Sequence, residues 1–170
     1  PVFVKRELER LFRFRYRRLS TDLDRHSFHA ERPRLTVAIT GASGLVGRAL
    51  THFLTTGGHT VLPMVRRQEG APEGAIHWNP RTGEIDAEAL ARADAVVHLA
   101  GASIAGGRWT DDREKVIRDS RVTGTDLVAR TMASLGASGP RVLVSASAIG
   151  YYGNRGDERL DESASQGGGF

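Results

Sequence analysis

Three glycines within residues 41–47 have the spacing of a turn that binds a phosphate-rich ligand. They directly follow an apolar run at residues 35–39, which predicts a buried strand. Glycines at these places let the strand turn sharply into a helix, and they leave the first N–H groups of that helix uncovered. Those groups and the positive end of the helix dipole stabilise a pyrophosphate. We therefore predict a dinucleotide-binding turn built from Gly41, Ala42, Ser43, Gly44, Leu45, Val46 and Gly47.

Glycine-rich segments can also be purely structural turns, so the surrounding sequence has to distinguish the two. A strand pattern precedes these glycines, a helix pattern comes after them, and strands and helices alternate beyond. That context favours dinucleotide binding. The spacing is Gly-x-x-Gly-x-x-Gly rather than the more familiar Gly-x-Gly-x-x-Gly.

Two consecutive arginines, Arg66 and Arg67, stand where such a chain selects between the two nicotinamide cofactors. An acidic residue at the end of the second strand accepts a hydrogen bond from a ribose 2′-hydroxyl and repels a 2′-phosphate. Here the second strand is predicted at residues 60–65, and the two arginines come directly after it. Guanidinium groups bind phosphate and stack on adenine, so NADP is favoured over NAD. Two solvated surface arginines are the alternative.

The elements that would position these residues alternate between strand and helix. We predict strands at residues 35–40, 60–65, 75–78, 94–99 and 141–145, and helices at 45–56, 85–91 and 111–135. Repeated βα units with right-handed crossovers give a doubly wound parallel sheet of the α/β class. In the longest helix we expect six side chains to point inward: Val116, Ile117, Val122, Leu127, Val128 and Met132.

The segment at residues 5–26 predicts a separate amphipathic helix. Its apolar stripe consists of Leu8, Phe12, Tyr16, Leu19 and Leu23, with arginines mostly on other faces. A basic amphipathic helix can lie on a membrane or bind a partner, or it can pack on a neighbouring domain, which we favour. We assign residues 1–33 to the last helix of a preceding domain plus a linker. Residues 34–170 are then an incomplete dinucleotide-binding domain, truncated at its C-terminus.

The charge distribution argues against nucleic acid as a partner. The net charge of +4 comes from residues 1–34, which hold ten Lys and Arg against five Asp and Glu; residues 35–170 hold fourteen against fifteen. The expected globular part therefore has no basic surface for a phosphate backbone. The chain has no cysteine and no metal-ligand spacing among its six histidines, and no apolar run long enough for a membrane. We expect a cytoplasmic protein without a metal site.

Together these residues resemble the extended short-chain dehydrogenase/reductases, which include sugar-nucleotide epimerases. Residues 40–47 look like their fingerprint, and residues 94–101 look like the motif that closes over the adenosine. The chain is most similar to an atypical epimerase branch related to bacterial YfcH, on residues 98–104, 108–110, 120–122 and 145–153. Some members carry a polyketide-cyclase-like domain in front, and the basic helix looks like the last helix of such a domain.

The resemblance implies a Rossmann-type fold and roles for particular residues. Arg66 and Arg67 match the branch's NADP-selecting pair, and Arg121 stands where an arginine would reach the cofactor, a surface arginine being the alternative. The adenosine-side loop is matched by His98, Leu99, Ala100 and Gly101.

Catalytic residues are less completely matched. Ser147 is nearest to the serine that holds the substrate oxygen in this superfamily, although the branch's register places Ala148 there. The Tyr-x-x-x-Lys pair that moves the proton is absent, since the only lysines are Lys5 and Lys115. The resemblance implies an NADP-dependent oxidoreductase or epimerase acting on a carbonyl or sugar-nucleotide-like small molecule. The alternative is a catalytically silent NADP(H)-binding sensor or regulatory module.

Overall fold

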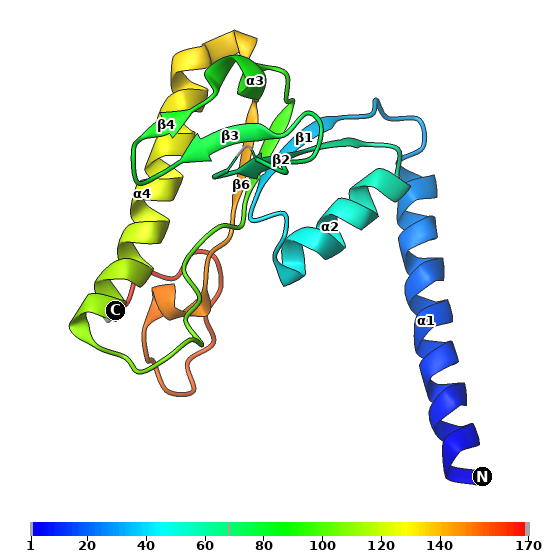
Figure 1. Cartoon of the computed structure of the whole chain (residues 1–170). Helices are drawn as coiled ribbons and strands as arrows, with labels where there is room; N and C mark the ends of the chain where they lie inside the picture. Colours follow the sequence, from blue (N-terminus) through cyan, green and yellow to red (C-terminus); the bar gives the residue numbers. More distant parts are fainter. Residues whose placement is uncertain (1, 68, 169–170) are drawn as a thin grey trace.

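The chain folds around one six-stranded sheet with helices on both of its faces (Figure 1). The structure is a computed structural model that describes residues 2–67 and 69–168; the outer ends of the expected domain ranges, Pro1, Gly169 and Phe170, lie outside the described residues. The strand order is β4-β3-β2-β1-β5-β6. The strands are β1 (Thr36–Thr40), β2 (Thr60–Val65), β3 (Ile76–Asn79), β4 (Glu84–Ile85), β5 (Ala95–His98) and β6 (Val142–Ser145).

Five of the six strands are parallel, which confirms the predicted doubly wound sheet. β1 pairs with β2 on one side and with β5 on the other, and β6 extends the sheet beyond β5. The exception is β4, which pairs antiparallel with β3. The prediction of a helix at residues 85–91 was therefore wrong at its start. Ile85 belongs to β4, and the side chain of Asp86 caps a helix that begins only at Ala87.

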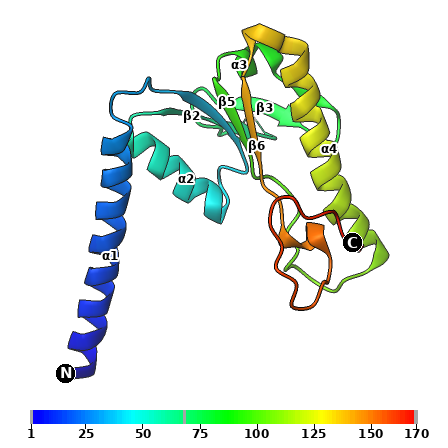
Figure 2. The same cartoon turned by 180° about the vertical axis from the view of Figure 1, so that it is seen from behind.

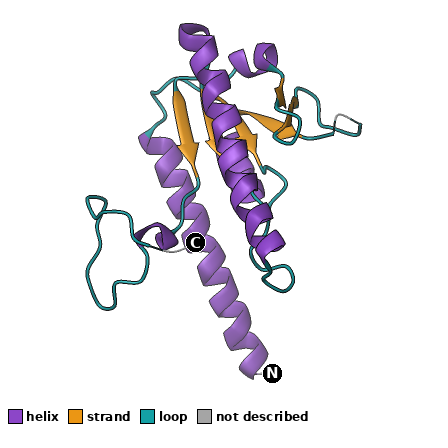
Figure 3. Cartoon of the chain, turned by 90° about the vertical axis from the view of Figure 1, so that its left-hand side faces the viewer, coloured by secondary structure: helices purple, strands orange, loops and turns teal. Residues whose placement is uncertain are grey.

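Helices on opposite faces enclose the sheet. α2 (Leu45–Thr56) lies on one face, and α3 (Ala87–Ala91) and α4 (Asp111–Leu135) lie on the other (Figures 1 and 2). Seen from the left-hand side of Figure 1, α4 lies in front of the strands and α1 (Val2–Phe28) lies behind them (Figure 3). Two short 3₁₀ helices complete the elements, η1 (Gly136–Ser138) and η2 (Ile149–Tyr152).

The hydrophobic core lies between the sheet and the α3–α4 face. Leu90 of α3, Val96 of β5 and Val128 of α4 are completely buried there. Of the side chains expected to point inward from α4, Ile117 and Val128 are buried, whereas Val116 and Val122 are exposed. The expectation that Val116 and Val122 point inward was wrong. A helix of 25 residues presents only one stripe to the sheet, and these two positions fall outside that stripe.

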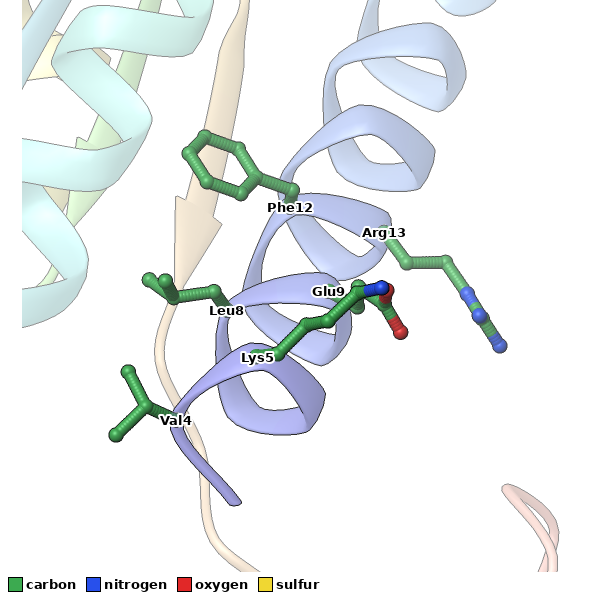
Figure 4. A pocket seen from close by; sticks show the side chains of 6 residues that line it. All are labelled: Val4, Lys5, Leu8, Glu9, Phe12 and Arg13. Carbon is green, nitrogen blue, oxygen red and sulfur yellow. The ribbon is translucent and has the colours of Figure 1, made fainter. Parts of the chain in front are cut away.

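The N-terminal helix α1 projects away from the sheet and contacts the rest of the chain near its C-terminal end (Figure 1). There the ring of His26 stacks on Phe53 of α2, with ring centroids 4.4 Å apart. Further out, Leu8 and Phe12 point from one face of the helix into solvent (Figure 4). Since the residues around them all come from α1, they form an open helix face rather than a cavity. In the described part of the chain no helix is both long and apolar enough to cross a bilayer.

Packing of α4 on the sheet can be tested with one pair of matched substitutions. Val128→Ala removes two buried methyl groups and should lower the free energy of unfolding by about 2 to 3 kcal/mol, measured by urea denaturation. Val122→Ala makes the same chemical change at a position 63% exposed on the same helix. It should change that free energy by less than about 0.5 kcal/mol. Equal losses in the two variants would contradict the orientation of α4.

Candidate functional site

The residues expected to bind a ligand gather at one edge of the sheet. Because β1, β2, β5 and β6 are parallel, the segments after them all emerge at their carboxyl ends. The chain passes from β1 to β2 on one side, whereas β5 pairs on the other side of β1. A crevice opens where the strand order reverses in this way, and it is the usual ligand site of such sheets. The glycine turn after β1 lies at this place.

The glycine turn depends on close contacts that leave no room for side chains. Gly41 has a φ of +69°, a conformation that favours glycine. A Cβ on Gly47 would lie 2.2 Å from the carbonyl oxygen of Gly41, and one on Gly44 would lie 3.2 Å from the same oxygen. The amide of Gly44 donates to that oxygen at 2.9 Å. The turn is therefore folded tightly against the first turn of α2.

The N-terminus of α2 remains open to a ligand. The helix begins after Gly44, which provides no side-chain cap. The first N–H groups of a helix have no partner within the helix, so those of Leu45 and Val46 are available to an anion. The side chains of Leu45 and Val46 are 83% and 64% exposed. Both the space that the glycines leave and the free N–H groups fit a pyrophosphate.

The glycine turn also meets the loop after β5. A Cβ on Gly41 would lie 3.1 Å from the backbone nitrogen of Ala100. One residue earlier, the hydroxyl oxygen of Thr40 accepts hydrogen bonds from the amides of Leu99 at 3.0 Å and Ala100 at 3.1 Å. Thr40 is completely buried. Its hydroxyl thus joins the two segments that form the crevice, a role that the glycine spacing alone did not predict.

His98 lies beneath this loop rather than in the open crevice. Its side chain is buried, and Nδ1 lies 2.8 Å from the Thr40 hydroxyl oxygen. Its ring meets that of Trp78 edge to face, with centroids 5.7 Å apart. Burial lowers the pKa of His98 below its usual value of 6.5, since the charged ring would lose its hydration. His98 is therefore neutral at physiological pH.

Side chains of α4 hold the far end of the same loop. The hydroxyl of Ser120 accepts from the amide of Ala102 at 2.9 Å. The Nη1 atom of Arg121 donates to the carbonyl of Ala102 at 3.1 Å and to that of Ile117 at 3.0 Å. Arg113 donates to the carbonyl of Ser103. The sequence singled out Arg121 but assigned no role to Ser120 or Arg113, because it does not show which helix face meets the loop.

A small cavity of about 130 Å³ lies between this loop and α4. The cavity is smaller than the 300–1,000 Å³ of most small-molecule sites, so it fits only part of a dinucleotide. Five of the predicted site residues line it together with Thr125 and Ala146. These five are His98, Leu99, Ala100, Gly101 and Arg121.

Arg66 and Arg67 come directly after β2 at the same edge of the sheet. Both are exposed, and neither has an ion-pair partner within residues 2–67 and 69–168. β2 is the immediate neighbour of β1, so the arginines lie one strand away from the glycine turn. Two guanidinium groups there are free to take a phosphate.

The residues after β6 begin beside the small cavity, which Ala146 lines. Ser147 is exposed and comes after Ala146, whose amide donates to the carbonyl of His98 at 2.9 Å. Tyr151 and Tyr152 pack against each other, with ring centroids 5.2 Å apart. Neither tyrosine lines the small cavity. Within the described ranges, no group of three or more His, Asp or Glu residues could hold a metal ion.

Comparison with known families agrees with this geometry. Residues 37–168 match the model of the NAD dependent epimerase/dehydratase family. The chain belongs to that family. An epimerase family protein of Mycobacterium bovis is 47% identical over 134 residues, which cover 79% of this chain and 43% of that protein. The chain therefore spans less than half the length of this curated relative.

Solved structures show the same fold. The nucleoside-diphosphate sugar epimerase from Corynebacterium glutamicum is 39% identical with a TM-score of 0.77, covering 94% of this chain and 33% of that one. Human epimerase family protein SDR39U1, solved with NADPH, is 27% identical with a TM-score of 0.62, covering 78% of this chain and 43% of the human chain. The fold is thus a Rossmann-like nucleotide-binding fold.

The close packing at the glycine turn gives a direct test of the site. Gly47→Ala would place a methyl group 2.2 Å from a backbone oxygen, and so should open the turn and displace the first amides of α2. We expect at least about a tenfold loss of affinity for a nicotinamide dinucleotide, measured by calorimetric titration. Gly150→Ala is the matched control, because a Cβ there meets nothing within 4 Å. Unchanged affinity in Gly47→Ala would contradict this site.

Proposed function

We propose that this chain forms the cofactor-binding half of an NADP-dependent epimerase or oxidoreductase that acts on a carbonyl or sugar-nucleotide-like substrate. The observation that carries the proposal is the open α2 N-terminus at Gly44, one strand away from two exposed arginines at the end of β2. Family membership supports the proposal independently.

In this proposal each part of the site meets one part of the cofactor. The amides of Leu45 and Val46 bind the pyrophosphate, because the helix terminus offers both donors and a positive potential. The loop at Leu99 and Ala100 forms the wall beside the adenosine. Arg121 keeps that loop in place through Ala102 and completes the wall of the small cavity.

We propose NADP rather than NAD as the cofactor because of Arg66 and Arg67. A 2′-phosphate adds a group with nearly two negative charges at the end of β2, and the arginines offer it charge-assisted hydrogen bonds. No acidic residue stands directly after β2 to accept from a free 2′-hydroxyl. The human relative solved with NADPH supports this choice.

The proposed chemistry comes from the cofactor when it is bound, since a nicotinamide ring interconverts an alcohol and a carbonyl by hydride transfer. The chain's own contribution would be to hold the cofactor and exclude water around it. We propose that Ser147 donates a hydrogen bond to the substrate oxygen, because its backbone comes directly after Ala146, which lines the cavity. We further propose that the substrate is a small molecule and that the protein is cytoplasmic. We also propose that it has no nucleic-acid or membrane partner and that a domain precedes residue 34.

One observation favours a second candidate function, a sensor that binds NADP(H) without turnover. The sequence contains no Tyr-x-x-x-Lys pair, and its two lysines lie on α1 and α4. The two functions differ in the step after cofactor binding.

Turnover is tested with protein that has been loaded with NADP⁺ and mixed with nucleoside-diphosphate sugars. An enzyme should develop the absorbance of reduced nicotinamide or release an altered sugar that NMR detects. Tight binding with neither change across such sugars would favour the sensor.

The cofactor preference is tested by removing the two guanidinium groups. Replacing both Arg66 and Arg67 with Ala should weaken NADPH binding by about 10- to 100-fold, the cost of one or two charge-assisted hydrogen bonds. NADH binding should change less than about threefold, because it has no 2′-phosphate. The matched control is Arg81→Ala, an exposed arginine in the turn between β3 and β4. Equal NADPH and NADH affinity in the unaltered protein would contradict the NADP assignment.

A further inference from the structure

The hydrogen bonds around the Thr40 hydroxyl fix where each proton lies. The oxygen accepts from two backbone amides, those of Leu99 and Ala100, and an amide can only donate. The single proton of the hydroxyl is therefore free to be donated elsewhere. The atom in reach is Nδ1 of His98, at 2.8 Å. Nδ1 must accept this proton, so the ring carries its own proton on Nε2.

The surroundings of Nε2 agree with that tautomer. Nε2 is buried and has no hydrogen-bond partner among the described residues. The ring meets that of Trp78 edge to face, with centroids 5.7 Å apart, and N–H groups make favourable contacts with aromatic rings. Gly124 of α4 lies beside the ring, and a Cβ there would be 3.4 Å from Nε2.

We infer that Thr40 and His98 form a positioning pair that fixes the loop after β5 against the glycine turn and thereby shapes the adenosine side of the dinucleotide site. The pair contributes no contact to the reacting atoms. It acts because one hydroxyl ties together β1, β5 and the two loop amides. The inference rests on the proposed dinucleotide function for its binding consequences, but the proton arrangement stands on the structure of the chain alone.

Protonation of His98 would break this arrangement. A second proton would sit on Nδ1 and face a hydroxyl oxygen that already accepts two amides, so three donors would compete for one acceptor. The neighbouring elements offer little negative charge to stabilise a protonated His98 ring. β1 and β6 bring no charged side chain, and His77 of β3 lies on the opposite face from Trp78. Arg121 of α4 lines the same cavity as His98. That arginine would repel a charged ring.

Acidification should therefore weaken both the loop and the fold. Because burial keeps the pKa of folded His98 below 6.5, the unfolded chain binds more protons than the folded one under mildly acidic conditions. Its contribution to stability is complete above pH 6.5 and is lost as the pH falls through the lowered pKa of the folded state. Dinucleotide affinity depends on the folded protein alone, so it should fall only as the pH reaches the lowered pKa at which folded His98 takes up a proton.

The test begins with the unliganded protein. Long-range proton–nitrogen NMR correlations of the His98 ring should show the proton on Nε2, and hydrogen exchange should show protected amides at Leu99 and Ala100. Thr40→Val keeps the side-chain shape but removes the hydroxyl. It should give a mixture of ring tautomers and exchange of the Ala100 amide that is at least about tenfold faster. The amide of Leu99 should change less, because it also donates to the backbone carbonyl of Thr40 at 3.3 Å. Thr40→Ser should restore protection, and Thr131→Val, a buried threonine of α4 bonded to Leu127, is the matched control.

Binding measurements then test the consequence for the site. Thr40→Val should weaken NADPH binding about tenfold and Thr131→Val should not. His98→Asn replaces Nδ1 with an uncharged amide oxygen, so the fall of affinity in acid that belongs to His98 should disappear. The slope of NADPH affinity against pH is compared between the unaltered protein and His98→Asn. Titration of the cofactor phosphate contributes equally to both slopes, so their difference belongs to His98.

The outcomes separate this inference from the proposed function. A proton on Nδ1, or a Thr40→Val protein with unchanged tautomer and amide exchange, overturns the positioning pair. Unchanged NADPH affinity in Thr40→Val, with faster amide exchange, overturns its role in the site. A protein that binds no dinucleotide overturns the proposed function and leaves the tautomer and exchange results to decide the pair.

Discussion

The missing side chain at Gly47 is the constraint on which this site depends. The first turn of α2 rests directly on the carbonyl oxygen of Gly41, and any Cβ would separate them. This contact turns the chain through the sharp angle between β1 and α2. It also sets the α2 N-terminus at the carboxyl edge of the sheet, where its uncovered amides face the crevice. Van der Waals contact of the backbone thus determines where an anion can bind.

A second link connects that turn to the rest of the crevice. The Thr40 hydroxyl ties β1 to the loop after β5, and α4 holds the other end of the loop through Ser120 and Arg121. Both are bonds between side chains and backbone. Such bonds let a loop without regular structure keep one shape, since each buried amide has a defined acceptor. The loop is therefore held at Leu99 and Ala100 by β1 and at Ala102 by α4.

The fold was predictable from sequence to a large extent because its signals are local. The apolar run before Gly41 and the helix pattern predicted at residues 45–56 depend only on nearby residues, and the structure places β1 and α2 there. Prediction was wrong where a segment is too short to carry a pattern of its own. Ile85 of β4 pairs with Trp78 of β3 instead of starting a helix, and this two-residue strand exists only through that pairing.

The site was predictable in its location and less so in its detail. The glycines and Arg66 have types that indicate their chemistry, and the fold brings both to one edge of the sheet. Their contact with a cofactor stays a prediction. The sequence could not reveal that the His98 side chain faces Trp78 and Gly124, or that Thr40 is its partner. Those relations join residues far apart in the chain only after the sheet has formed.

The α1 helix lies away from the candidate site and contacts the sheet domain near its own C-terminal end. Its apolar face is exposed over most of its length, and His26 seated on Phe53 is its anchor to the sheet domain. The Corynebacterium glutamicum structure covers 94% of this chain, which is more than the family match at residues 37–168 includes. The helix therefore has a counterpart in part of that longer chain.

The central claim is that the glycine turn and the arginines together hold a 2′-phosphorylated dinucleotide. An NMR titration that compares NADP⁺ with NAD⁺ tests it most directly. Both ligands should shift the amide signals of Gly44, Leu45 and Val46, and only NADP⁺ should shift the guanidinium signals of Arg66 and Arg67. Unmoved glycine-turn amides, or arginine signals that respond equally to both ligands, would contradict the claim.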